Sequence, residues 1–138
     1  MKLQSSAMAM LLAAMLLLPG CAQIARRSSD APEAAHQTID AKAAFAMMQD
    51  SDEYILLDVR TPEEYGVSHI EGALLLPDYE LEARAEEALP DKDARILVYC
   101  RSGRRSAASA ATLAGMGYTQ VYDFGGIIDW SYGTVTGE

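Results

Sequence analysis

The chain has little cysteine, few aromatic residues and no apolar run long enough to span a membrane. It contains two cysteines, one tryptophan and two phenylalanines among 138 residues. Two cysteines allow at most one disulfide. The longest apolar run, residues 7–18, has twelve residues, whereas about 20 are needed to cross a bilayer. No metal-ligand spacing and no glycine-rich phosphate loop is visible, so the sequence implies neither a metal nor a cofactor.

Acidic residues are missing from the N-terminal segment and abundant after it. All twenty Asp and Glu lie at Asp30 or beyond, and the formal net charge is -9. A surface this acidic repels a phosphate backbone, so we expect no nucleic-acid partner. The chain is 50% hydrophobic and 22% charged, with 10 Gly and 5 Pro, which fits one folded domain and excludes collagen-like and fully disordered chains.

The N-terminal segment has the layout of an export signal. One lysine and a short polar stretch precede the apolar run, which has the length of a secretory hydrophobic region. The run ends Leu18-Pro19-Gly20-Cys21 and resembles the lipobox of bacterial lipoproteins. The resemblance implies that residues 1–20 are a signal peptide and that Cys21 is lipidated. Ordinary cleavage after export and a retained anchor are the alternatives.

Residues 21–37 are predicted to form a polar tether between Cys21 and the domain, because they carry one large aliphatic residue, Ile24, and no aromatic one. We therefore expect a lipid-anchored domain on the periplasmic or extracytoplasmic face. The lipoprotein resemblance favours the outer membrane where there are two, because Ala22 is not the aspartate that would retain the protein at the inner one. An acylated Cys21 cannot pair with Cys100, which leaves Cys100 as an isolated thiol.

From residue 38 to residue 138, short aliphatic runs alternate with helical patterns. This alternation is typical of an α/β domain with a mainly parallel central sheet flanked by helices. Strands are predicted at residues 54–59, 74–76, 95–99 and 120–123. Helices are predicted at residues 41–49, from Thr61 and Pro62 onward, at 78–89, at 106–116 and, briefly, at 127–130. About 100 residues can enclose one modest core without disulfides, so we expect a single monomeric domain.

Cys100 directly follows a predicted buried strand, and the loop after it leads into a helix. That loop consists of Arg101, Ser102, Gly103, Arg104 and Arg105. Open parallel sheets bind ligands beyond the carboxyl ends of their strands. Backbone N–H groups of the loop, the helix N-terminus and the arginines all favour thiolate over thiol. We therefore expect the pKa of Cys100 to lie below its usual value of about 8.5. The alternative is an inert buried Cys100 beside solvated arginines.

The length of this loop separates two families that use such a thiolate. Phosphatases of the Cys-x5-Arg type carry an arginine six positions after the cysteine, where this chain has Ser106. Here Arg105 stands five positions after Cys100, and Cys-Arg-Ser-Gly-Arg-Arg resembles the active loop of rhodanese-type sulfurtransferases. Residues 58–73 and 123–130 resemble the strand-helix-turn and C-terminal turn of the same family. The resemblance covers about residues 38–132.

The resemblance implies a single rhodanese-like domain that moves sulfane sulfur without a cofactor. Cys100 would attack an anionic donor such as thiosulfate and pass the sulfur from a persulfide to a thiol, cyanide or a protein thiol. Residues 101–105 would bind the donor through their N–H groups. Arg101 and Arg104 are expected to face it, whereas Arg105 either pairs with an acid or faces the substrate.

Two other functions stay open at this point. A persulfide-binding or anion-binding module without turnover needs the same residues as a turnover enzyme. A thiol phosphatase or arsenate reductase is disfavoured by the loop length. Asp58 and Arg60 are interpreted as scaffold, and His69 as a residue that fixes a turn.

Overall fold

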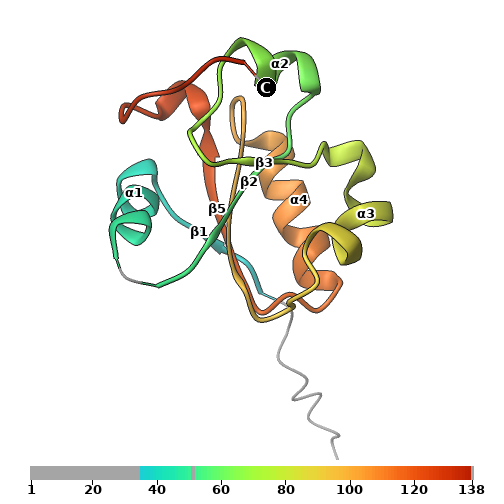
Figure 1. Ribbon diagram of the computed structural model, residues 1–138. Helices are drawn as coiled ribbons and strands as arrows, with labels where there is room; N and C mark the ends of the chain where they lie inside the picture. Colours follow the sequence, from blue (N-terminus) through green and yellow to red (C-terminus); the bar gives the residue numbers. More distant parts are fainter. Residues whose placement is uncertain (1–34, 51, 138) are drawn as a thin grey trace, which may run out of the picture.

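The protein folds around a five-stranded parallel sheet with the order β1-β5-β4-β2-β3 (Figure 1). The computed structural model describes residues 35–50 and 52–137; the predicted signal peptide, Cys21 and most of the predicted tether lie outside the described residues. The strands are β1 (Gln37–Thr38), β2 (Ile55–Asp58), β3 (Leu74–Leu75), β4 (Arg95–Cys100) and β5 (Gln120–Gly126). The predicted α/β class with a parallel sheet is confirmed.

Helices cover both faces of the sheet (Figure 1). They are α1 (Ala41–Gln49), α2 (Pro62–Val67), α3 (Leu81–Ala88) and α4 (Arg104–Gly115), with the 3-10 turns η1 (Asp78–Glu80) and η2 (Ile127–Asp129). Helices α3 and α4 pack on one face, whereas α1 and the C-terminal segment lie on the other. Among the described residues, none of these helices has the length and apolarity that a membrane span requires.

The central strand β4 shows why the sheet is buried on both faces. Successive side chains of a strand point to opposite faces. Ile96, Val98 and Cys100 accordingly join the core under α3 and α4. Leu97 and Tyr99 join the second core, on the side of α1. All five are buried, which is why the strand reads as a continuous apolar run.

Two helix starts match their sequence signals. The Asp40 carboxylate accepts a hydrogen bond from the N–H of Ala43 at 2.7 Å and caps α1. At α2, Thr61 and Glu64 form a capping box in which each side chain accepts the other's backbone N–H. Pro62 stands at the first helical position, where no N–H is needed. Helix α2 is therefore fixed at the carboxyl end of β2, next to the predicted site.

Two predicted helices have other boundaries in the structure, and one short strand was not predicted. The helix expected at residues 106–116 begins at Arg104, because Gly103 serves as its N-cap with φ of +102°. The helix expected at 78–89 is split into η1 and α3. The two-residue strand β1 was not predicted, since a pattern needs more than two residues to show a period. It places Gln37, assigned above to the tether, beside Tyr122.

Strand β5 also continues further than predicted. The sequence Gly125-Gly126 suggested a turn, yet Gly126 still pairs with Cys100 of β4 after an irregularity in the ladder. The carboxyl ends of β2, β4 and β5 consequently meet at one edge of the sheet, at the top of Figure 1. The predicted loop lies at this edge.

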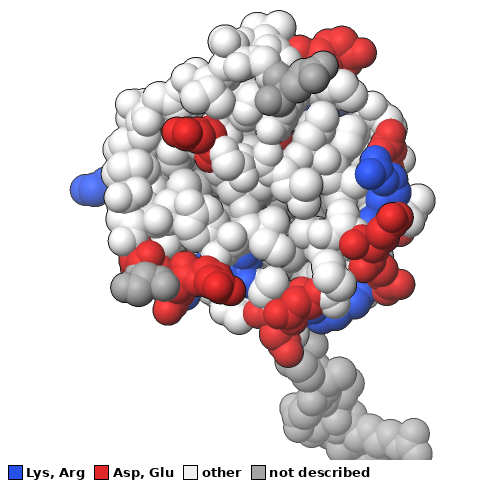
Figure 2. Space-filling model, viewed as in Figure 1, with Lys and Arg blue, Asp and Glu red and all other residues white. Residues whose placement is uncertain are grey.

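Acidic side chains outnumber basic ones on the face shown in Figure 2.

Candidate active site

Cys100 is the last residue of β4, and its thiol is buried at the base of the loop. The residue is 1% exposed, and within the described part of the chain it is a free cysteine. The N–H of Gly103 donates to Cys100 Sγ at 3.0 Å. The hydroxyl oxygen of Ser106, in the first turn of α4, lies 3.6 Å from the same sulfur. The Gly103 N–H therefore donates to the sulfur, and the Ser106 hydroxyl oxygen accepts the hydrogen of the thiol.

Hydrogen bonding lowers the pKa of Cys100. Burial pushes that pKa upward, but hydrogen bonds from the Ser106 hydroxyl and from backbone N–H groups of Ser106, Gly103 and Ser102 lower it by more. The net direction agrees with the expectation from the sequence. Hydrogen bonds are the largest of the effects that lower the pKa of Cys100. The sequence argument had also relied on the charges of the arginines. A lowered pKa makes the thiolate, the nucleophilic form, more abundant near neutral pH.

Two glycines shape the loop around this sulfur. Gly103 adopts a φ of +102°, a left-handed conformation that side chains disfavour. Gly126, opposite Cys100 in the sheet, has no room for a side chain: a Cβ there would collide with the carbonyl oxygen of Arg101 and lie 2.7 Å from Ser102 Cα. The Asp123 carboxylate accepts the N–H of Gly125 at 3.0 Å and fixes the end of β5 behind the loop.

The three arginines of the loop have different environments. Arg101 and Arg104 are exposed, and neither forms an ion pair with any residue in the described ranges. Arg105 is only 22% exposed and makes a bidentate pair with Glu64, with distances of 2.7 and 2.8 Å. Of the two arrangements that the sequence left open for Arg105, the structure has the one in which it pairs with an acid.

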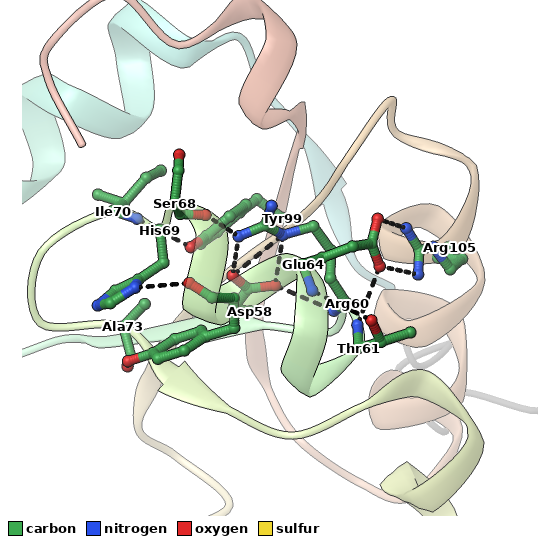
Figure 3. Close-up of polar contacts among 11 residues, drawn as sticks. Asp58, Arg60, Thr61, Glu64, Ser68, His69, Ile70, Ala73, Tyr99 and Arg105 are labelled. Carbon is green, nitrogen blue, oxygen red and sulfur yellow. Dashed lines mark hydrogen bonds and ion pairs between the residues drawn. The ribbon is translucent and has the colours of Figure 1, made fainter. Parts of the chain in front are cut away.

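Glu64 joins the loop to helix α2 (Figure 3). One of its oxygens, Oε2, accepts both the N–H of Thr61 at 3.0 Å and Arg105 Nη1 at 2.8 Å. The hydrogen bond from Arg105, together with that from Thr61, outweighs partial burial and lowers the pKa of Glu64 to about 2. The carboxylate is therefore ionised at every pH at which the protein is expected to work.

A second arginine–carboxylate pair, Arg60 with Asp58, is buried more deeply than the first (Figure 3). Arg60 donates to both oxygens of Asp58, at 2.9 and 2.6 Å, and to the carbonyl of Ser68 at 2.8 Å. Arg60 also lies 5.5 Å from the ring centre of Tyr99. Burial and the Asp58 carboxylate raise the pKa of Tyr99, so its hydroxyl stays protonated. This fully bonded pair fits a scaffold role for Asp58 and Arg60.

His69 stabilises the turn after α2. Its Nδ1 lies 2.9 Å from the carbonyl oxygen of Tyr65, and the two rings stack at 3.7 Å. The Tyr65 hydroxyl donates to the carbonyl of Ala73 at 2.7 Å, and the backbone of His69 pairs with that of Val135. These contacts fit the interpretation of His69 as a residue that fixes a turn.

In the part of the chain that the structure describes, Cys100 belongs to no group of metal ligands and lies apart from the cavity at the other edge of the sheet. Within the described residues, no group of three or more His, Cys, Asp or Glu side chains is placed to hold a metal ion. A cavity of about 780 Å³ lies at the opposite edge of the sheet, lined by Tyr54, Pro90 and Arg95 among others. It lies at the start of β4, whereas Cys100 ends that strand, so it is separate from the site.

Comparison with known proteins identifies the family of the folded domain. The model of the rhodanese-like domain matches residues 41–132, two thirds of the chain, including the Cys100 loop. The chain belongs to the rhodanese-like domain family. The matched range also contains Glu64 and both arginine–carboxylate pairs.

Individual relatives of this rhodanese-like domain agree with the match. The thiosulfate sulfurtransferase PspE of Escherichia coli is 41% identical over 81 residues, covering 59% of this chain and 78% of the relative. A sulfurtransferase of Allochromatium vinosum is 37% identical over 94 residues, covering 67% and 86%. Among solved structures, a rhodanese with anions from E. coli superposes with a TM-score of 0.58 at 39% identity, covering 62% of this chain and all of the other.

Sequence reasoning missed three residues that build the site. Glu64 was counted in the start of a helix and in the motif of residues 58–73, but nothing local linked it to Arg105, 41 positions away. Ser106 was noted as the start of a predicted helix and as the residue that stands where a phosphatase has arginine. Gly126 was assigned to a turn. The one available signal was position in the sequence. Glu64 and Gly126 both lie in motifs that already indicated a site.

Proposed function

We propose that this rhodanese-like domain is a sulfurtransferase that carries sulfane sulfur on Cys100. The observation that carries the proposal is the sulfur of Cys100, which accepts a hydrogen bond at the base of the loop. Two arginines of this loop, Arg101 and Arg104, are exposed and form no ion pair within the described residues. Membership of the family, and relatives named as thiosulfate sulfurtransferases, support it.

The proposed reaction has two steps. The Cys100 thiolate attacks the outer sulfur of an anionic donor such as thiosulfate, the sulfur–sulfur bond of the donor breaks, and sulfite leaves with the electron pair. The persulfide then gives its outer sulfur to cyanide, a thiol or a protein thiol and restores the thiolate. Arg101 and Arg104 attract the donor, and backbone N–H groups of the loop stabilise the charge on the transferred sulfur. An ionised Cys100 needs no general base.

Loop geometry supports this reaction over phosphate chemistry. A phosphatase of the Cys-x5-Arg type needs its arginine at position 106, where the chain has a buried serine. Arg105 is held by Glu64, which keeps its guanidinium away from a substrate in the loop. A persulfide carrier without turnover is the remaining alternative, and the test below separates it from an enzyme.

The proposal is tested by incubating the domain with thiosulfate and cyanide, following thiocyanate and the mass of the protein. We expect a gain of one sulfur on Cys100, its loss to cyanide, and neither in Cys100→Ser. Gain without release identifies a carrier. No gain at all overturns the proposal, and phosphate-ester hydrolysis by the same sample would put a phosphatase in its place.

The two exposed arginines are tested with donors of different charge. Arg101→Ala and Arg104→Ala should each weaken the binding of thiosulfate about tenfold, which corresponds to a loss of about 1.4 kcal/mol of charge-assisted binding. They should weaken the binding of a neutral persulfide donor much less. Arg95→Ala removes the same charge at the other edge of the sheet and serves as the control. Equal losses with both donors would contradict an electrostatic role.

We also propose that the domain is exported and lipid-anchored through Cys21. The support is the apolar run that ends at Gly20 and the polar residues that follow Cys21. Acyl chains contribute about 0.8 kcal/mol per buried CH₂, so several chains on one residue give firm attachment. Growth with a labelled fatty acid should mark the wild type and leave Cys21→Ser unlabelled. Label on both, or on neither, would contradict the anchor.

A further inference from the structure

The hydroxyl of Ser106 has one hydrogen to donate and several possible acceptors nearby. The residue is completely buried, and its Oγ lies 3.1 Å from the carbonyl oxygen of Gly103, 3.2 Å from that of Gly125 and 3.6 Å from Cys100 Sγ. A serine hydroxyl carries one hydrogen and rotates about its Cβ–Oγ bond. It can therefore donate to the sulfur or to the carbonyls, and the charge on the sulfur decides between them.

The three states of Cys100 make different demands on this hydroxyl. A neutral thiol donates its own hydrogen to Ser106 Oγ, which leaves the hydroxyl hydrogen for the carbonyl of Gly103 or Gly125. A thiolate is a charged acceptor, and hydrogen bonds to charged acceptors are roughly twice as strong as neutral ones. In a persulfide, Sγ becomes a neutral bridging sulfur and the negative charge moves to the outer sulfur.

We propose that Ser106 is a catalytic residue whose hydroxyl turns towards Cys100 Sγ in the thiolate and back to the carbonyls of Gly103 and Gly125 in the persulfide. This rests on the proposed function for the persulfide state, but not for the thiolate. No proton is gained or lost in the turn: thiolate plus thiosulfate gives persulfide plus sulfite, with the same total charge on both sides.

The arrangement helps one half of the cycle more than the other. Stabilising the thiolate makes Cys100 a better leaving group when the outer sulfur is passed on, because a thiol with a lower pKa leaves faster. It also makes the thiolate a somewhat weaker nucleophile during loading. Ser106 therefore favours release of sulfur to the acceptor over its retention.

Helix α4 provides a matched control. Ser109 lies in the same helix, three residues after Ser106, and is 3% exposed. Its hydroxyl is buried and has no hydrogen-bond partner within the described residues. Ser109→Ala thus removes a buried hydroxyl from the same helix without touching Cys100 or the loop. Ser106→Thr keeps a hydroxyl at the position of interest.

The first test needs no sulfur donor. The pH midpoint of Cys100 is measured from the rate of alkylation by iodoacetamide, and independently from thiolate absorbance. Ser106→Ala should raise the midpoint by about one unit, corresponding to one hydrogen bond to a charged group. Ser106→Thr and Ser109→Ala should leave it within a few tenths of a unit. A midpoint unchanged in Ser106→Ala would overturn the proposal even if the domain transfers sulfur.

The second test separates the two half-reactions. The test is made at a pH above the Cys100 midpoints of both the wild type and Ser106→Ala. Loading of Ser106→Ala by thiosulfate should then be as fast as in the wild type or faster. Unloading of its persulfide by cyanide should be about a few-fold slower, because a thiol with a higher pKa leaves more slowly. The variant should therefore accumulate persulfide during turnover. Equal slowing of both half-reactions would indicate general damage to the site and contradict the proposal.

A third measurement uses the wild type and does not depend on whether Ser106→Ala folds. The carbonyl carbon resonances of Gly103 and Gly125 report the hydrogen bonds that they accept. They should shift with the ionisation of Cys100 and move back when thiosulfate converts it to the persulfide. Carbonyl resonances that are identical in thiol, thiolate and persulfide would overturn the proposal. A domain that takes up no sulfur but shows the first shift would instead contradict the proposed function.

Discussion

Two arginine–carboxylate pairs lie at the carboxyl edge of the sheet, and they differ in burial and in what they hold. Asp58 and Arg60 have side chains that are 0% and 5% exposed, and both are bonded within the scaffold. Glu64 and Arg105 are 27% and 22% exposed, and Arg105 belongs to the Cys100 loop. The buried pair should therefore govern the free energy of unfolding, whereas the partly exposed pair should govern the shape of the loop.

The largest effect is expected from breaking the buried pair. Asp58→Ala leaves the Arg60 guanidinium buried without its acid, which typically costs about 3–5 kcal/mol. Urea denaturation measures this loss. Adding Arg60→Leu should restore part of the stability, because the unpaired charge is then removed. A loss below about 1 kcal/mol would show that water or Ser68 can replace the carboxylate.

A smaller loss of stability and a larger loss of activity are expected at the partly exposed pair. Glu64→Gln removes the charge that holds Arg105 and weakens the cap of α2, which should lower the free energy of unfolding by about 1–2 kcal/mol. Sulfur transfer should fall about tenfold in kcat/KM for thiosulfate, as expected for roughly 1.4 kcal/mol of lost preorganisation. If activity per folded molecule stayed at the wild-type level, Arg105 would not shape the loop.

Acid should remove the contribution of the same pair. The pKa of Glu64 falls from an ordinary 4.5 to about 2 in the folded protein, so the folded state binds fewer protons than the unfolded state. The stabilisation is complete above pH 4.5 and is lost as pH falls towards 2. The difference in unfolding free energy between wild type and Glu64→Gln should therefore shrink over this range. Arg105→Gln lacks the guanidinium that causes the shift. In that background, the difference in unfolding free energy made by adding Glu64→Gln should hardly change with pH.

The smallest effect is expected from a third pair at the opposite edge of the sheet. Arg95 contacts Asp50 at 3.1 Å and Asp52 at 2.8 Å, and these carboxylates are 48% and 69% exposed. Exposed pairs contribute at most about 1 kcal/mol and are screened by salt. Arg95→Gln should change stability by less than this and leave sulfur transfer unaltered. An effect comparable to that of Glu64→Gln would mean that distance from the loop does not separate the pairs.

The sequence predicted the layers and the nucleophile because both have local signals. Strand β4 is a run of apolar residues that ends in Cys100, and the glycine and arginines after it stand next to each other in the chain. The capping box of α2 is likewise contained in four residues. Such patterns need no knowledge of the tertiary structure, so the fold class was predictable.

The parts that the sequence could not predict depend on contacts between distant segments. Glu64 reaches Arg105 because β2 and β4 are neighbours in the sheet, and several acids could have served as partner on charge alone. Gly126 is needed because β5 runs directly beneath the backbone of Arg101 and Ser102. The start of α4 was misplaced because Gly103 acts both as the loop's turn and as the helix cap.

The shared oxygen of Glu64 gives the site a cooperative opening. Because Oε2 accepts from both Thr61 and Arg105, release of the loop and fraying of the first turn of α2 become one event instead of two. In amide hydrogen exchange, the N–H of Thr61 and that of Gly103, which donates to the sulfur, should therefore exchange with a common opening free energy. A protein acceptor too bulky to enter the loop would then reach the buried sulfur only as often as the first turn of α2 frays.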